Sequence, residues 1–275
     1  MNIVCRIDNT DTFKSTEQAT YIDFFDSNSF SYTFWDNRNK LPHWYSQQAL
    51  DLLYISLAVF AADRLCLRKN AVDGWSRDLK ICIPVLEYDL WEQAKETLEE
   101  MLGFLSGDEW TFVFRKREWT ENEKTKHEKW EKSKQQVKDY ELLCMFSGGL
   151  DSFIGAIDLL ESENKKTLFI SHYGGGKGTK EFQDILKEKF ISQYSLESRD
   201  FHQYYAKVVA GVEDTTRTRS FMFFSHAIAV ASCLKKTVDL IIPENGFISL
   251  NIPSTFSRMA TSSTRTTHPH YMALF

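Results

Sequence analysis

The feature that most constrains this chain is a short apolar run that stops at a pair of glycines. Residues 142–146 are all apolar, the next six read Ser147-Gly148-Gly149-Leu150-Asp151-Ser152, and helical spacing then continues to about Glu163. A continuous apolar run bounded by glycine is typical of a strand buried on both faces of a parallel sheet. The sequence therefore predicts a strand, a sharp turn and a helix, the repeating unit of α/β domains.

The remaining C-terminal residues alternate in the same way. Helices are expected at 152–163, 180–191 and 220–234, and strands at 142–146, 167–170 and 238–242. This alternation predicts an α/β domain with a doubly wound parallel sheet over residues 140–275. Ligands of such sheets bind at the carboxyl ends of the strands.

The first 118 residues mix strand-like and helical segments and predict a smaller α+β N-terminal domain. Strands are expected at 31–35, 79–86 and 109–117, and helices at 46–68 and 89–105. In the first helix, Leu53, Leu57 and Phe60 recur at helical spacing, which predicts an amphipathic helix.

Residues 119–139 are rich in lysine and glutamate and connect the two domains. We expect a solvated helix or linker stabilised by pairs such as Glu128 with Lys132. A basic contact with nucleic acid is the alternative interpretation. Acidic residues are interleaved throughout the stretch, which favours the solvated helix.

Composition narrows the classes of partner and compartment. The net charge of −5 is not the basic excess typical of nucleic-acid binders, so nucleic acid is not expected as a partner. The five cysteines form no C-x-x-C pair, which favours reduced thiols in a cytoplasmic protein. The longest apolar stretch, 52–62, is shorter than the roughly 20 residues of a membrane span, and no targeting segment is visible at the N-terminus. We therefore expect a cytoplasmic protein without a membrane segment.

The glycine turn is the strongest candidate for a binding site. Gly148 and Gly149 allow close backbone approach, and their N–H groups are expected to face an anion at the start of a helix. Ser147 and Ser152 add hydroxyl donors, while Asp151 is expected to orient the loop or hold Mg²⁺. The loop lacks the Gly-Lys-Ser/Thr ending of a Walker A motif. An ordinary capped corner between a strand and a helix is the alternative interpretation.

Residues 146–152 resemble the PP-loop motif of the adenine nucleotide α-hydrolase-like superfamily, whose members cleave ATP between its α and β phosphates. The order of segments from Tyr140 to Ser257 resembles the 7-cyano-7-deazaguanine synthase (QueC-like) branch. The resemblance implies that ATP binds to Ser147, Gly148, Gly149, Leu150, Asp151 and Ser152, with Mg²⁺ at Asp151. It further implies that a carboxylate, such as one on a 7-deazaguanine, is adenylated and that an amine then displaces AMP.

Two cationic segments follow the loop. The resemblance implies that Lys177, in the glycine-rich segment 171–178, neutralises phosphate charge; a flexible connector is the alternative. Arg217 and Arg219 open the predicted helix 220–234, where cations oppose the helix dipole, and a bound anion would relieve that conflict. The family places an arginine against ATP here, and Arg219 is the better match. Exposure of both arginines to solvent is the alternative.

The final segments both match the family and depart from it. Glu244 and Asn245 are expected to hydrogen-bond a purine-like base at the end of the strand 238–242. The family's four-cysteine zinc cluster is not reproduced, because no cysteine follows Cys233, so zinc is not expected. His268 and His270 are a weak metal signal within an expected polar loop. A shortened family member without a clear terminal element is therefore expected.

The N-terminal region of about 140 residues resembles that of extended QueC-like proteins from bacterial anti-phage gene cassettes, such as the Qat type. That resemblance implies a defence role beside protein partners from the same cassette. Two alternatives stay open: synthesis of 7-cyano-7-deazaguanine for queuosine in tRNA, and a non-catalytic nucleotide-binding scaffold. The acidic balance and the lack of paired cysteines count against tRNA sulfur transfer or lysidine formation.

Overall fold

A computed structural model describes residues 1–133, 138–162, 165–174, 178–214, 217–246 and 265–275. The strands form sheet A, with the order β2-β1-β4-β5, and sheet B, with the order β3-β8-β7-β6-β9. The strands are β1 (Asn2–Arg6), β2 (Ala19–Asp23), β3 (Phe30–Tyr32), β4 (Asp78–Val85), β5 (Glu109–Lys116), β6 (Leu142–Met145), β7 (Thr167–Tyr173), β8 (Phe201–Val208) and β9 (Asp239–Ile241). The helices are α1 (Gln47–Leu65), α2 (Tyr88–Ser106), α3 (Glu121–Lys132), α4 (Leu150–Ser162), α5 (Thr179–Tyr194), α6 (Arg219–Ser232) and α8 (Pro269–Leu274), with short 3-10 turns η1 (Phe34–Lys40), η2 (Arg68–Asn70) and η3 (Ser198–Asp200).

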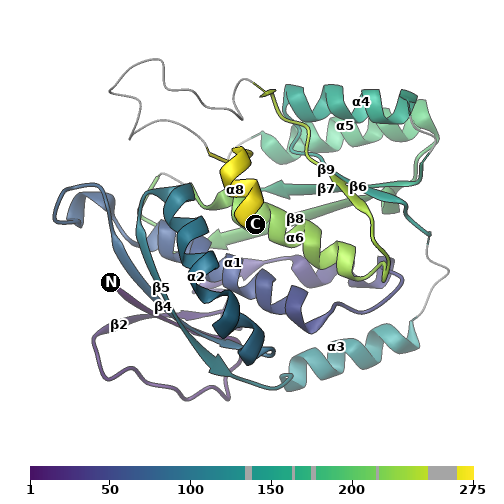
Figure 1. The fold of residues 1–275 in the computed structure, drawn as a ribbon. Helices are drawn as coiled ribbons and strands as arrows, with labels where there is room; N and C mark the ends of the chain where they lie inside the picture. Colours follow the sequence, from purple (N-terminus) through teal and green to yellow (C-terminus); the bar gives the residue numbers. More distant parts are fainter. Residues whose placement is uncertain (134–137, 163–164, 175–177, 215–216, 247–264) are drawn as a thin grey trace.

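Sheet B carries the predicted parallel strands of the C-terminal region. β8, β7, β6 and β9 are parallel neighbours, and all four residues of β6 are buried, as expected for a central strand. Helices α4 and α5 lie on one face of this sheet, and α6 and α1 lie on the other (Figure 1). The chain is therefore an α/β protein, as the sequence predicted.

Sheet A corrects the expectation of an α+β arrangement in the N-terminal region. All of its strand pairs are parallel, and α2 connects β4 to β5 as a crossover helix. Most residues of β4 are buried, which is the pattern of a strand covered on both faces. Strands β1 and β2 were not predicted, because each is only five residues long and only three residues of β1 lie between its polar ends, Asn2 and Arg6.

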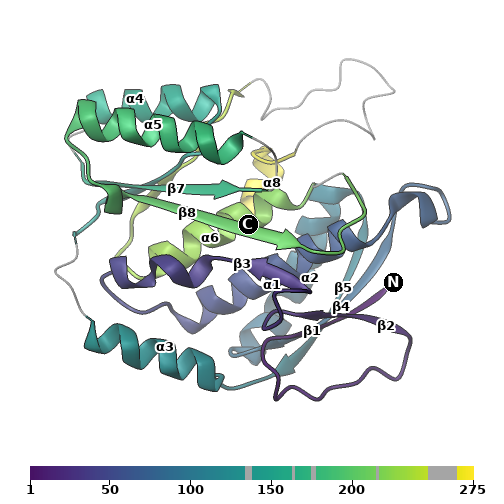
Figure 2. The same ribbon diagram turned by 180° about the vertical axis from the view of Figure 1, so that it is seen from behind.

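Strand β3 connects the two halves of the chain. It is an edge strand of sheet B and runs beside β8 (Figure 2). The pairing is antiparallel, with Phe30 opposite Val208 and Tyr32 opposite Ala206. The predicted strand 31–35 is therefore shorter than expected, since Phe34 and Trp35 begin η1 with both rings buried. One hydrophobic core contains residues from both halves, including Phe30 and Tyr204.

Helix α1 is buried on all sides rather than amphipathic. It packs against β4 of sheet A as well as against α6 and β8, so 14 of its 19 residues are buried. A helix enclosed in this way carries apolar residues around its whole circumference. Its two buried acids, Asp51 and Asp63, stand near its ends and need partners. Asp51 accepts hydrogen bonds from the N–H groups of Leu86 and Glu87 at the start of α2.

Asp63 belongs to a buried ionic cluster with Arg68, Arg77 and Asp108. Arg77 Nη2 lies 2.6 Å from Asp63 Oδ1 and 2.6 Å from Asp108 Oδ2, and Arg68 donates two hydrogen bonds to Asp108. Burial raises the pKa of Asp108, but the hydrogen bonds from Arg77 and the charges of Arg77 and Arg68 together outweigh it and hold that pKa below its ordinary value. The cluster joins the end of α1 to β4 and to the turn before β5.

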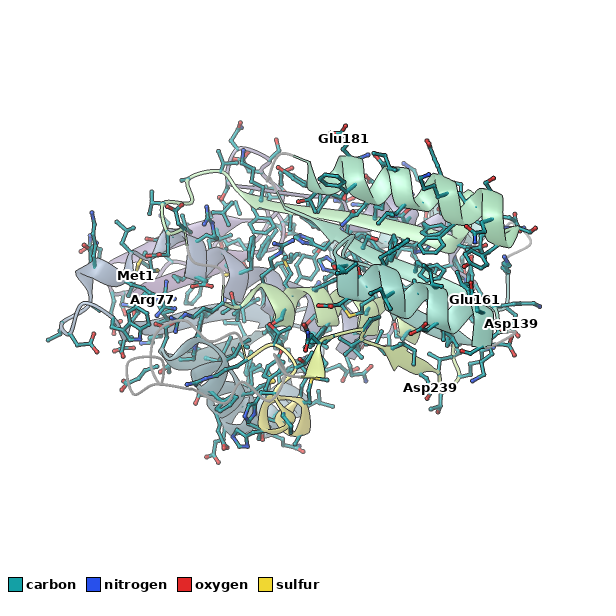
Figure 3. All side chains as sticks on the ribbon, turned by 90° about the horizontal axis from the view of Figure 1, so that it is seen from above. Met1, Arg77, Asp139, Glu161, Glu181 and Asp239 are labelled. Atoms are coloured by element: carbon teal, nitrogen blue, oxygen red, sulfur yellow. The ribbon has the colours of Figure 1, made fainter. Side chains whose placement is uncertain are left out.

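The ionic cluster lies on the side of the molecule toward which the parallel strands of sheet B run. In Figure 3, Arg77 and Met1 lie at one end of the molecule, and Asp139, Glu161 and Asp239 lie at the other. Asp139 precedes β6 and Asp239 begins β9, so these two residues mark the amino ends of the parallel strands. The carboxyl ends of sheet B therefore point toward the side of the ionic cluster.

The charged stretch 119–139 forms α3 over the part that is described. A capping box joins Thr120 and Glu123, and Lys124 pairs with Glu121 at 2.7 Å on the exposed face. The other face buries Trp130, whose ring lies in a cluster of tryptophans with Trp44. The helix is solvated on one side, as expected, and is anchored to the domain by its other side.

The end of the chain differs from the expected polar loop. Residues 269–274 form α8, which packs on α2 and buries Tyr271 completely. His268 accepts a hydrogen bond from the backbone N–H of His270 at the start of this helix. Among the described residues, no helix has the length and apolar character that crossing a membrane requires.

The ionic cluster predicts a large effect of removing one charge. Asp108→Asn would leave Arg68 and Arg77 without one of their two carboxylates, and breaking a buried pair costs about 3–5 kcal/mol. We expect the free energy of unfolding in urea to fall by about that amount. Asp23→Asn, in the partly exposed pair of Asp23 with Arg6, serves as a control and should cost under about 1 kcal/mol. Equal losses in the two variants would contradict the role given to the cluster.

Candidate functional site

The predicted glycine corner forms at the carboxyl end of β6. Gly148 has a φ of +86°, a conformation that non-glycine residues rarely adopt. A Cβ on this residue would also lie 2.9 Å from Cγ of Gln183. Both backbone conformation and close approach therefore require glycine here.

Gln183, on α5, fixes the corner to the neighbouring strand. Its Nε2 donates to the carbonyl oxygen of Ser147 at 2.9 Å and to that of His172 at 3.2 Å. The side chain is 1% exposed. Sequence reasoning missed this residue, because a single glutamine in an amphipathic helix carries no signal of its contacts.

The amide groups of the two glycines are used differently from the prediction. Gly148 N–H donates to Ser152 Oγ at 3.1 Å, and Gly149 N–H donates to Ser147 Oγ at 3.3 Å. Serine hydroxyl groups thus occupy the donors that were expected to face an anion. The hydroxyl of Ser147 in turn donates to Ser152 Oγ at 3.0 Å.

The donors that remain belong to the first turn of α4. Within the described residues, the N–H groups of Leu150, Asp151 and Ser152 have no acceptor, because the first bond of the helix runs from Phe153 N to Gly149 O. Leu150 and Asp151 are exposed, whereas Ser152 is buried. The start of α4 therefore presents three parallel amides where the helix dipole favours negative charge.

A carboxylate from the last strand approaches this turn. Pro243 packs against Gly155 of α4. There is no room for a side chain on Gly155, because a Cβ there would lie 2.5 Å from Pro243 Cβ. The next residue, Glu244, is close enough to Asp151 for their charges to interact: burial of its carboxyl raises the pKa of Glu244, and the charge of Asp151 raises it further. The structure thus brings together Asp151 and Glu244, which the sequence assigned to different roles.

Arg219 begins α6 near the carboxyl end of β7. A Cβ on Gly174 would lie 4.0 Å from Arg219 Cζ, and the charge of Arg219 acts on His172. Arg219 as a residue is exposed, yet the protein atoms around its guanidinium bury it enough to lower its pKa. Across the described parts of the chain, no carboxylate pairs with it.

The conflict between two arginines and the α6 dipole is relieved by the protein itself. Asp63 Oδ2 accepts hydrogen bonds from the N–H and the Oγ1 of Thr218, at 3.2 and 3.0 Å. A buried carboxylate therefore stands where a bound anion was expected. Arg217 turns away from this point and donates to the carbonyl oxygen of Ser106 at 3.1 Å.

Strand β7 is longer than predicted and includes Ser171 and His172, which were assigned to the following loop. Ser171 Oγ donates to the carbonyl oxygen of Phe146 at 2.6 Å, so its polar group is satisfied inside the sheet. His172 is 2% exposed, and neither ring nitrogen has a partner among the described residues. Burial holds the pKa of His172 well below its ordinary value, with smaller effects of His226 and Arg219.

His172 belongs to a row of buried aromatic and histidine rings beneath sheet B. The ring of His226 lies 6.2 Å from that of His172 and 5.1 Å from Tyr204, whose hydroxyl is 3.3 Å from His202 Nδ1. Burial lowers the pKa of His202 to about 3 and that of His226 to about 4. His226 is a core residue, as predicted, and all three histidines are neutral at pH 7.

Some predicted site residues lie outside what the structure describes. Lys177 is one of them, as are residues 175–176 of its glycine-rich segment. Asn245 is exposed beside Glu244. Within the described ranges, no three His, Cys, Asp or Glu side chains gather as a metal site, and the five cysteines are buried free thiols.

Comparison with families of proteins, with curated proteins and with solved structures found no match to this chain. The resemblance to the PP-loop superfamily therefore depends on residues 146–152 and on the order of the segments around them.

The contact of Gly155 with Pro243 predicts a stability effect of unusual sign. Alanine in place of a helix glycine normally stabilises by up to about 1 kcal/mol, but in Gly155→Ala the methyl group would displace Pro243 and Glu244. We expect a loss of about 1–3 kcal/mol in the free energy of unfolding, from overpacking. Gly103→Ala on α2, where the nearest atom to the added Cβ is 3.4 Å away, is the matched control. A higher free energy of unfolding in both variants would show that Pro243 moves aside without cost.

The buried histidines predict loss of stability in acid. The unfolded state takes up protons as the pH falls below about 6.5, while folded His202 and His226 stay neutral to about 3 and about 4. The free energy of unfolding should therefore decrease below pH 6.5, by up to about 1.4 kcal/mol per pH unit for each histidine. Urea unfolding between pH 7.5 and 4.5 measures this slope. His202→Leu should lower the slope by the contribution of one histidine, up to about 1.4 kcal/mol per pH unit. An unchanged slope would show that His202 is not one of the groups that titrate between the folded and unfolded states.

Proposed function

We propose that this chain binds Mg·ATP at the carboxyl edge of sheet B and uses it to adenylate a carboxylate. The observation that carries the proposal is the start of α4, where three free amides stand next to the hydroxyl of Ser147. Phosphate oxygens are the acceptors that such an array favours. The proposed fold of the C-terminal region is the doubly wound PP-loop type, with the loop following its first strand.

In the proposed reaction, a substrate carboxylate oxygen attacks the α-phosphorus of ATP. The bond from the α-phosphorus to the bridging oxygen breaks, and pyrophosphate leaves. An amine nitrogen then attacks the acyl carbon, loses a proton, and AMP departs with the former carboxylate oxygen. The protein contributes position and fixed charge rather than covalent chemistry.

The amides of Leu150, Asp151 and Ser152 would hold phosphate oxygens through their N–H groups. Arg219 would stabilise the negative charge that develops on the phosphates, because its guanidinium pairs with no described carboxylate. Lys177 remains proposed for the same charge. Rotation of the Ser147 side chain about its Cα–Cβ bond would move Oγ away and release the Gly149 amide as a further donor.

Asp151 supplies a carboxylate that suits Mg²⁺ bound together with ATP. Magnesium in nucleotide sites is held by one or two carboxylates, and phosphate oxygens and water complete the coordination. When bound, it neutralises charge on the phosphates. Its charge would also relieve the repulsion between Asp151 and Glu244, which raises the pKa of Glu244.

For the acid substrate we propose a 7-deazaguanine carboxylate, recognised in part by Glu244 and Asn245, and a role in anti-phage defence with proteins from the same gene cassette. A second candidate is a nucleotide-binding scaffold without turnover. The hydrogen bonds of the Gly148 and Gly149 amides favour it, because both N–H groups already have acceptors within the loop.

The test is release of pyrophosphate and AMP from Mg·ATP, with and without a 7-carboxy-7-deazaguanine and an amine donor. Asp151→Asn should lower kcat/KM by about 100-fold, because it removes one carboxylate at the phosphates. Asp158→Asn makes the same change on an exposed residue of α4, two turns further on, and should leave turnover unchanged.

The two candidates differ in product. ATP binding by calorimetry without AMP formation would support the scaffold, and equal turnover in wild type and Asp151→Asn would remove Asp151 from the mechanism. Absence of ATP binding would end both proposals.

A further inference from the structure

Thr218, the residue before α6, is held by the N-terminal half of the chain. Its own side chain makes no capping bond to α6. Instead, the N–H and the hydroxyl of Thr218 both donate hydrogen bonds to Asp63 Oδ2. Thr218 and Asp63 are both buried. The start of α6 is therefore capped by a carboxylate from α1.

The Asp63 carboxylate has a fixed orientation. Its other oxygen, Oδ1, is bound by Arg77 Nη2, and Arg77 Nη1 donates to the backbone oxygen of Asp63. Arg77 is in turn held by Asp108 through two side-chain hydrogen bonds, one to each carboxylate oxygen. Thr218 is thus attached to a group that has little freedom to rotate.

A second contact fixes the residue before Thr218. The guanidinium of Arg217 lies 4.5 Å from the ring of Trp75 and donates to Ser106 at the C-terminal end of α2. Cations are favoured at helix C-termini. Residues 217 and 218 are therefore both bound to the N-terminal half, and Arg219 follows them directly.

Arg219 itself points elsewhere. It lies beside Gly174 and acts on His172 at the carboxyl end of β7, the edge that also carries the glycine corner. An arginine side chain has several rotatable bonds, so the direction of its backbone decides which region the guanidinium reaches. The contacts of Thr218 determine that direction.

We propose that Asp63 is a positioning residue, which aims Arg219 at the phosphates of ATP through Thr218. The inference rests on the proposed function for the identity of the ligand, but the positioning itself is a property of the ligand-free protein. It makes the N-terminal half a required part of the nucleotide site.

The structure separates this role from general stability. Asp108 shares Arg77 with Asp63, but Thr218 bonds only Asp63 among the described acidic residues of the cluster. Asp108→Asn therefore weakens the same ionic cluster without removing a bond of Thr218. Thr218→Val removes the hydroxyl bond to Asp63 at nearly constant volume, and Thr218→Ser keeps it.

The experiment compares these three variants by two measurements. The first is the NMR order parameter of the Arg219 Nε–H group without ligand, its signal assigned from its absence in Arg219→Lys. The second is kcat/KM for ATP. We expect Thr218→Val to lower both, the second by about 10- to 100-fold, while Thr218→Ser stays near wild type and Asp108→Asn, measured below its unfolding temperature, lowers both less than Thr218→Val does.

A double-mutant cycle tests whether the effect passes through Arg219. In an Arg219→Met background, Thr218→Val should cause no further loss of kcat/KM. An additive loss, or an unchanged order parameter in Thr218→Val, would overturn the proposal. If the order parameter falls but wild type releases no pyrophosphate, the positioning stands and the proposed function fails.

Discussion

The hydrogen bonds of the two carboxylates on α1 are the constraint on which the rest of the structure depends. α1 is enclosed by sheet A, sheet B and α6, so its acids cannot reach water. Asp51 meets the start of α2, and Asp63 meets the start of α6. The N–H groups at the start of a helix lack acceptors within the helix. A buried carboxylate accepts hydrogen bonds from them and thereby gains the partners that it needs itself. One helix thereby fixes where two others begin.

The candidate site consequently has a local part and a remote part. The glycine corner is built from neighbouring residues in the sequence, with Gln183 as its main outside support. Arg219 lies at the same edge of sheet B, and the two residues before it are attached to the N-terminal half. Changes far from the corner, at the end of α1, would thus alter the electrostatics of the site without altering its loop.

The sequence predicted the local part well. The run 142–152 has an apolar strand, two glycines and a helix in succession, and each of these signals is satisfied by short-range contacts. Helices α1, α2, α4, α5 and α6 were expected within a few residues of their actual bounds, because each has a long periodic pattern. In contrast, β8 was missed, because its histidine, glutamine and tyrosines interrupt the apolar pattern that would indicate a buried strand. The bond of Asp63 to Thr218 joins residues distant in the chain, and a single sequence contains no signal of it.

Strand β3 also makes the N-terminal half depend on a strand that is synthesised much later. Phe30 and its neighbours are made early, but their partner strand β8 is made only after β6 and β7. The side of α1 that packs on α6 is covered later still, because α6 follows β8 in the chain. Pairings so distant in the sequence slow folding and leave apolar surface open to other chains. The nascent N-terminal half is thus the stage at which chaperones would be needed most, although in the finished protein it shares one core with the C-terminal half.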